Sequence, residues 1–189
     1  RGLLTYLRNK VPEAVVEVTS RYPDSSSFLL GEPLVRDDLF AFHQRKTGVR
    51  GFLTRYIVPH VLHLAVKGWW AGPLPAHITQ QIDLIKQYDA VVQVGGSFFV
   101  DLYGVMQFEY SLCTLLAGRQ LFLVGHSLGP FQSSGFNFIA RTVFDRADSI
   151  YLRERESLSL LNEANLPVSK VCEGADTAWL VELGSSEPP

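Results

Sequence analysis

The chain has 189 residues, of which 47% are hydrophobic and 19% are charged, and its net charge is −2. This composition can form a buried core, which excludes a disordered chain, and the lack of a basic surplus argues against a general nucleic-acid-binding protein. Two cysteines, Cys113 and Cys172, are too few for a disulfide framework. We expect both to be buried thiols in a reducing compartment, and therefore a cytoplasmic protein.

In chain order, an opening helix and a short strand over residues 14–19 come first. Residues 21–74 then break the alternation of strands and helices. Between Leu39 and Ile82 there is no acidic residue, and this stretch holds four of the five histidines and five basic side chains: Arg45, Lys46, Arg50, Arg55 and Lys67. Such a stretch either faces something anionic, such as a phosphate or a membrane surface, or is a solvated helical segment packed through its aromatic side. The sequence leaves these two interpretations equally open.

From residue 75 onward, strand and helix signals alternate. Short apolar runs predict strands at residues 90–94, 121–124, 149–152 and 168–172, and helical spacing predicts helices from residue 75 and over 105–116, 136–147 and 157–164. Strands separated by helices indicate β-α-β crossovers, so we predict a doubly wound α/β domain with a mostly parallel sheet of about five strands. Ligands of such sheets bind beyond the carboxyl ends of the strands, which directs attention to the loops that follow them.

Residues 125–129 read Gly-His-Ser-Leu-Gly and match the G-x-S-x-G nucleophile elbow of serine hydrolases. In that fold the catalytic histidine follows the serine along the chain, whereas no histidine follows His126 here. A hydrolase built on Ser127 is therefore the least favoured alternative. In the other interpretation the two glycines let the backbone turn sharply near a ligand, and His126 or Ser127 offers it a polar group.

Three further loops follow predicted strands. Residues 95–101 read Gly-Gly-Ser-Phe-Phe-Val-Asp, residues 153–157 read Arg-Glu-Arg-Glu-Ser, and residues 174–177 read Gly-Ala-Asp-Thr. Each loop taken alone also has a purely structural interpretation, in which Asp101 caps the helix that begins near Gly104 and Ser157 caps the next one. No metal-ligand spacing is present, so no metal is expected.

Taken in order, the four loops resemble the polysaccharide pyruvyl transferase family. That family has a Gly-Gly-Ser-x-x-x-Asp loop, a Gly-x-x-x-Gly-Pro loop, an Arg-Asp/Glu-x-x-Ser element and a late Asp-x-Ala, and the colanic acid branch is the closest match. The resemblance implies that residues 1–183 are one Rossmann-like half of a two-domain enzyme similar to B-type glycosyltransferases, with 184–189 as a linker. It further implies an amino-terminal half that lacks its first strand and is inactive alone. A true B-type glycosyltransferase half that uses a nucleotide sugar is the main alternative.

The resemblance also implies a reaction, in which pyruvate from phosphoenolpyruvate becomes a ketal on two hydroxyls of a sugar, without a cofactor. The implied acceptor is a sugar on a lipid diphosphate in exopolysaccharide synthesis, so peripheral contact with the inner membrane face is expected. A ketal needs a general base, a proton donor and cations for the donor's charges. We take His126 and Asp101 as catalytic candidates and expect most of the cationic clamp outside this chain. The substrate-binding candidates are Gly95, Gly96, Ser97, Gln107, Ser127, Arg153 and Asp176.

Overall fold

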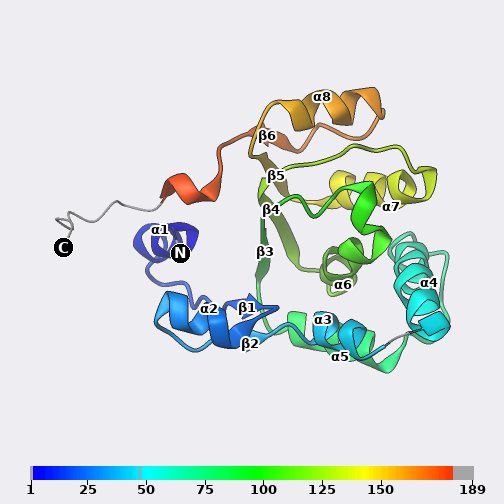
Figure 1. The fold of residues 1–189 in the computed structure, drawn as a ribbon, viewed down its shortest axis with the longest axis horizontal. Helices are drawn as coiled ribbons and strands as arrows, with labels where there is room; N and C mark the ends of the chain where they lie inside the picture. The colour runs from blue at the N-terminus through cyan, green and yellow to red at the C-terminus, as the bar shows by residue number, and fades with distance from the viewer. Residues whose placement is uncertain (1, 47, 181–189) are drawn as a thin grey trace. The chain divides into compact units, whose positions relative to one another are not determined.

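The computed structural model describes residues 2–46 and 48–180, and their contacts divide them into two compact units. The small unit comprises the described residues up to Asp37 and from Asp176 onward, and the large unit comprises Asp38–Ala175 (Figure 1). All but one of the predicted site residues belong to the large unit. The single domain expected over residues 1–183 stays a prediction.

The small unit contains two very short parallel strands and three helices. The strand predicted at residues 14–19 is largely absent, since Val15 is 97% exposed and only the last residue of that run joins a strand. A strand persists only where its backbone groups find partners, and those partners lie in a second strand that the sequence did not reveal. The elements are α1 (Gly2–Lys10), β1 (Thr19–Ser20), α2 (Pro23–Leu30), β2 (Val35–Arg36) and the 3₁₀ helix η3 (Thr177–Leu180).

The large unit is built on a four-stranded parallel sheet in the order β3-β4-β5-β6. Its strands are β3 (Ala90–Val94), β4 (Gln120–His126), β5 (Ser149–Leu152) and β6 (Val171–Glu173). Its helices are α3 (Asp38–Arg45), α4 (Gly48–Val66), α5 (Ala76–Ile85), α6 (Glu109–Leu116), α7 (Ser134–Arg146) and α8 (Glu156–Glu163), with 3₁₀ helices η1 (Asp101–Tyr103) and η2 (Val105–Phe108).

Every strand of this sheet is connected to the next one by a helix, as parallel pairing requires. Right-handed crossovers in sequential order place successive helices on the same face, and Figure 1 shows α6 and α7 on one side of the sheet. The α/β class with a parallel, Rossmann-like sheet flanked by helices is therefore confirmed. The expected sheet of about five strands is instead one of four strands, with β1 and β2 forming their own pair.

The helix predicted over residues 105–116 begins as a 3₁₀ helix and becomes α-helical only at Glu109. Val105 and Phe108 are both buried and lie three residues apart, a spacing that suits either kind of helix. The sequence therefore predicted the buried face correctly but not the type of the first turn.

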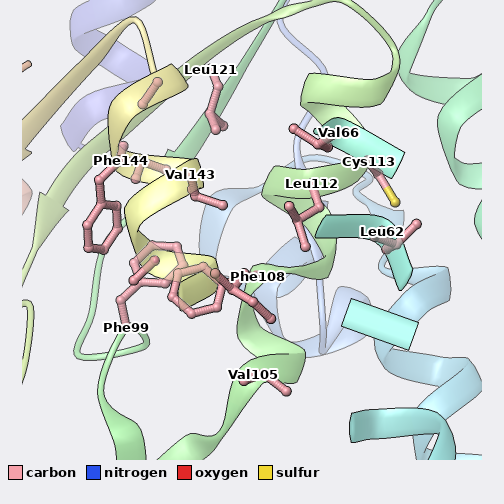
Figure 2. Packing of buried hydrophobic residues seen from close by; sticks show 14 of the residues in the cluster. Leu62, Val66, Phe99, Val105, Phe108, Leu112, Cys113, Leu121, Val143 and Phe144 are labelled. Atoms are coloured by element: carbon pink, nitrogen blue, oxygen red, sulfur yellow. The ribbon is translucent and has the colours of Figure 1, made fainter. Parts of the chain in front are cut away.

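The core of the large unit lies between the sheet and the helices on that face. In Figure 2, Leu62 and Val66 of α4 lie beside Leu112 and Cys113 of α6. Burial and the nearby Glu109 raise the pKa of the Cys113 thiol, so this cysteine is a core residue as expected. The same expectation is wrong for Cys172, which is exposed on β6. None of the described helices has the length and apolar character needed to cross a membrane.

Candidate functional site

The loops that follow β3 and β4 run side by side and extend the parallel pairing beyond the strands. Gly95 N–H donates to Val124 O at 2.7 Å, and Gly129 N–H donates to Phe99 O at 3.0 Å. A Cβ atom at Gly95 would lie only 1.9 Å from the carbonyl oxygen of Gly125, so this close approach requires glycine. The two glycine-rich motifs thus form one continuous backbone platform at the carboxyl edge of the sheet.

His126, the first catalytic candidate, lies inside this platform and is 0% exposed. Its Nε2–H donates to Gln93 O at 2.9 Å, and its ring centroid lies 5.0 Å from that of Phe99. Burial lowers the pKa of His126 to about 4, with the charge of Arg153 adding to the effect and backbone hydrogen bonds opposing it. The ring is therefore neutral at pH 7 and touches no solvent, so in this arrangement it holds β4 against β3.

Asp101, the second catalytic candidate, anchors the loop that leads into α7. Its Oδ2 accepts backbone N–H groups of Gln132 at 2.5 Å and of Ser133 at 2.6 Å. Ser133 is the N-cap of α7 and accepts from Phe136 N through its side chain. Asp101 does not cap the helix near Gly104, because its carboxylate is directed to the neighbouring loop instead. The catalytic roles of Asp101 and His126 stay predictions.

Beyond β4 and β5, four side chains form a connected network, which we call the 127–157 network. Glu154 lies at its centre and accepts from Ser127 Oγ at 2.9 Å and from Ser157 Oγ at 2.6 Å. Arg153 donates through Nε to Glu154 at 3.1 Å and through Nη2 to Ser127 Oγ at 2.5 Å. Ser157 Oγ also accepts the backbone N–H of Leu128 at 2.8 Å. The network thereby ties the loop after β4 to the loop after β5.

The electrostatics of this network determine what it can do. Burial alone would raise the pKa of Glu154, but hydrogen bonds from Ser157, Ser127 and Arg153 and the charge of Arg153 outweigh burial and lower it. Glu154 is therefore a fixed carboxylate that orients Arg153, and it is a poor proton donor at neutral pH.

The same geometry argues against a serine hydrolase. A serine nucleophile requires a base that takes its proton, usually a histidine held against the hydroxyl. Ser127 Oγ instead hydrogen-bonds a carboxylate and a guanidinium, while the adjacent His126 ring is directed into the core toward Gln93. Ser127 is therefore a hydrogen-bonding group of the network.

A small cavity of about 260 Å³ opens beside the network. Arg155 and Glu173 pair across it at 3.1 Å, and among the predicted site residues Arg153 lines it. Its lining is Leu152, Arg153, Glu154, Arg155, Glu173 and Gly174. The structure thus brings the loops after β4, β5 and β6 to one edge, where a half-buried arginine is the cation best placed for an anionic ligand.

The remaining candidates lie around this edge or outside the large unit. Ser97 is exposed in the loop after β3, and Gln107 is half-buried in η2. Asp176 belongs to the small unit, where its Oδ1 accepts the backbone N–H of Ala178 at 2.9 Å. Sequence reasoning missed the central role of Glu154 and the double role of Ser157, although both belong to the Arg-Glu-x-x-Ser element that it had singled out.

Within residues 2–46 and 48–180, no group of three or more His, Cys, Asp and Glu side chains is arranged to hold a metal ion. The hydrogen-bonding groups of the edge are hydroxyls, carboxylates, backbone amides and the guanidinium groups of Arg153 and Arg155. This donor set suits a ligand that carries both anionic groups and hydroxyls.

Comparison with known proteins decides the family. The model of the polysaccharide pyruvyl transferase family matches residues 1–188. The chain belongs to this family. The family predicted from the order of the four loops is thereby confirmed.

One curated relative is similar along the whole chain. The chain is 41% identical over 192 residues to the amylovoran biosynthesis protein AmsJ of Erwinia amylovora, a match that covers 100% of this chain and 46% of the relative. The chain therefore spans just under half the length of that relative. No solved structure matches the chain.

Proposed function

We propose that the protein containing this chain transfers pyruvate from phosphoenolpyruvate to a sugar, as a ketal, during the synthesis of an exopolysaccharide. The observation that carries this proposal is the family match over residues 1–188. A relative named for amylovoran biosynthesis, similar along the entire chain, supports the link to exopolysaccharides. Because the chain spans 46% of that relative, the activity is assigned to the whole enzyme, to which this chain contributes one edge of the active site.

The proposed reaction joins C2 of phosphoenolpyruvate to two sugar oxygens. One hydroxyl adds to C2 while the methylene C3 gains a proton, and the second hydroxyl then displaces the phosphate. One hydroxyl proton balances the proton gained at C3, and the other leaves with the phosphate. The reaction requires a base, an acid and a cationic clamp, and it requires no cofactor or redox step.

For the donor, the proposed contact is Arg153. Its planar guanidinium matches a carboxylate or phosphate through paired hydrogen bonds. Glu154 fixes the guanidinium on one side, and Ser127 lies on the other as an additional hydrogen-bonding group. Arg155 of the same cavity is already paired with Glu173. Arg153 alone is too little for a donor that carries a carboxylate and a phosphate, so the remaining cations are assigned to the rest of the enzyme.

For the acceptor, the proposed contacts are Ser97 and the carboxylate of Asp101. Oδ2 of Asp101 is occupied by backbone amides, whereas Oδ1 is buried and accepts no hydrogen bond from the described residues. Oδ1 is therefore the atom that we assign to a sugar hydroxyl. The burial of His126 favours a positioning role, since direct proton transfer would require the ring to leave the core.

Gln107 and the backbone of Gly95 and Gly96 complete the proposed acceptor contacts of the large unit, and Asp176 of the small unit stays a substrate-binding prediction. We further propose an acceptor that resembles a colanic acid repeat and is carried on a lipid diphosphate. This finer assignment rests on the motif resemblance alone.

The test is an assay of the full-length enzyme with phosphoenolpyruvate and a lipid-diphosphate-linked oligosaccharide. We expect equal amounts of inorganic phosphate and of ketal, the latter visible as a new methyl signal by proton NMR. Activity with a nucleotide sugar and none with phosphoenolpyruvate would overturn the proposal in favour of a B-type glycosyltransferase.

A matched pair of variants tests the donor contact. Arg153→Gln removes a charge-assisted contact worth about 1.5 to 3 kcal/mol, so kcat/KM for phosphoenolpyruvate should fall about ten- to a hundredfold. Arg141→Gln removes a positive charge from an exposed position on α7 and should leave this parameter near the native value. Equal effects of the two substitutions would contradict the assignment of Arg153.

A further inference from the structure

The amino-terminal half of α4 presents large apolar side chains to solvent. Helical spacing places all of them on one stripe of the helix. They are Val49 (75% exposed), Phe52 (68%), Leu53 (45%), Tyr56 (53%) and Ile57 (48%), and we call them the α4 patch. Solitary exposed apolar residues are ordinary on protein surfaces, but a contiguous stripe of this kind marks an interaction site.

The opposite side of α4 is already committed to the core. Val58, Leu62 and Val66 are buried, and Figure 2 shows Leu62 and Val66 directed toward α6. A helix that is apolar all round is normally covered on both sides. The described residues therefore leave this side of α4 exposed, and the rings of Phe52 and Tyr56 lie parallel on it with their centroids 6.5 Å apart.

The charged side chains of the stretch that contains the patch are all basic. No aspartate or glutamate occurs between Leu39 and Ile82. Arg45, Lys46 and Arg55 are exposed at the end of α3 and on α4, and Arg55 donates to the carbonyl of His43, which holds its head group beside the end of α3. At the other end of α4, Trp69 follows the helix and is 70% exposed.

We propose that the α4 patch and its basic neighbours dock the protein onto an anionic lipid bilayer, with α4 lying in the interface. Interfacial helices combine an apolar face with Lys and Arg, and tryptophan concentrates at the same depth of the membrane. An apolar patch alone would suit a protein partner equally well. The complete lack of carboxylates over this stretch favours an anionic bilayer, because a carboxylate would be repelled there. A protein partner would not require this lack of carboxylates.

Lipid docking deepens the proposed function. The biological use of docking rests on that function, whereas lipid binding itself does not. A lipid-linked acceptor would be presented at the same surface that the patch contacts. Binding to lipid is measured without any substrate, and transfer is measured with the lipid-linked acceptor dissolved in detergent without vesicles, so failure of one leaves the other intact.

The experiment is co-sedimentation of the full-length protein with vesicles of phosphatidylcholine alone or mixed with phosphatidylglycerol. We expect binding only to the mixed vesicles, and weaker binding as salt is added. The double variant Phe52→Gln/Ile57→Gln should weaken binding at least about tenfold, because burial of these side chains drives insertion. The double variant Arg45→Gln/Lys46→Gln should weaken it roughly 25-fold at low salt, at about fivefold per charge.

Two matched controls make the result specific. Phe28→Gln removes an equally large and even more exposed ring from α2, and Arg141→Gln/Lys170→Gln removes two exposed charges elsewhere in the large unit. Both should bind as the native protein does, and circular dichroism should show that every variant is folded. Equal binding to neutral vesicles, equal losses in the controls, or a patch variant that keeps lipid binding but loses self-association would each overturn the proposal.

Discussion

Gly95 illustrates how single residues shape the carboxyl edge of the sheet. Its backbone runs so close to the next loop that the carbonyl of Gly125 occupies the space of a side chain. Gly125 itself has a φ of 70°, a conformation that suits glycine. The glycines are therefore required by contacts between backbones, whatever the ligand.

Gly95→Ala should lower the free energy of unfolding by about 3 kcal/mol, because the obstructing atoms belong to backbone that cannot move aside. Urea denaturation of the full-length protein measures this loss. The matched control is Gly96→Ala, whose Cβ would meet only the movable ring of Phe98 at 3.1 Å. If both variants lose the same amount, the steric argument fails.

Ser127→Ala should leave the fold intact and reduce pyruvyl transfer by about tenfold or less, since it removes hydrogen bonds that each contribute about 1 kcal/mol. A nucleophile of a catalytic triad would cost about 10⁴-fold. Steady-state kinetics of the full-length variant distinguishes these outcomes. A loss on the larger scale would restore the hydrolase-like interpretation.

At the scale of secondary-structure elements, a buried hydrogen bond between two side chains joins α3 to α6. His43 Nε2 lies 2.6 Å from Glu109 Oε2, and both side chains are almost completely buried. Burying polar side chains is costly, and the hydrogen bond compensates for this only while both partners are present. The pair therefore mainly fixes the orientation of α3 against α6, and its net contribution to the free energy of unfolding is small.

His43→Leu alone should cost about 3 to 5 kcal/mol, because it leaves the Glu109 carboxylate buried without its histidine partner. The double variant His43→Leu/Glu109→Met should be less destabilised than the sum of the two single variants. Urea unfolding of the native protein, both single variants and the double variant gives the coupling energy. Simple additivity would show that the two side chains act independently.

At the scale of the whole molecule, buried histidines make the stability depend on pH. Burial lowers the pKa of His63 to about 4, helped by the charges of Lys67 and His60, and burial likewise lowers that of His126. Below pH 6.5 the unfolded chain binds a proton on each ring, whereas the folded chain does so only near pH 4. The stabilisation that comes from keeping these two histidines neutral is therefore fully present above pH 6.5, and it is lost as the pH decreases toward 4.

Each of these histidines contributes on the order of 1 to 3 kcal/mol to that loss. His63→Leu should flatten the fall between pH 6.5 and 4 and cost little at pH 7, because neither ring nitrogen of His63 has a hydrogen-bond partner among the described residues. Thermal unfolding at a series of pH values measures the slope. Ile139→Val alters the core without changing a titratable group and should keep the native slope. An unchanged slope in His63→Leu would contradict the assigned role.

Residues 1–189 expressed alone should show no pyruvyl transfer. The proposed reaction places donor and acceptor together, and the loss of groups that position them forfeits several kcal/mol of barrier lowering. The described edge offers the donor Arg153 and an Arg155 that is already paired with Glu173, which is too little for the donor's charges. The measurement supplies this chain and the full-length enzyme with the same substrates. Ketal formation at comparable rates would show that the donor site is complete within this chain.

Local patterns in the sequence predicted the family, the α/β class and the positions of three of the four sheet strands. The fourth strand, predicted at residues 168–172, lies at Val171–Glu173 and shares only two residues with the prediction. Apolar runs that end at glycine mark parallel strands locally, and the order of four loops is a linear property, so neither requires knowledge of the packing. The same local signals gave Arg153 and Ser127 as substrate-binding candidates, and these roles stay predictions.

The contacts that these residues make depend on the packing of the strands. Glu154 became the centre of the network because β4 and β5 are neighbours, which brings Ser127 and Ser157 to one carboxylate. His126 reads as a reactive group in sequence, but the adjacent strand and Phe99 bury its ring. Burial and long-range pairing depend on which elements lie side by side, and a local pattern of residues does not contain that information.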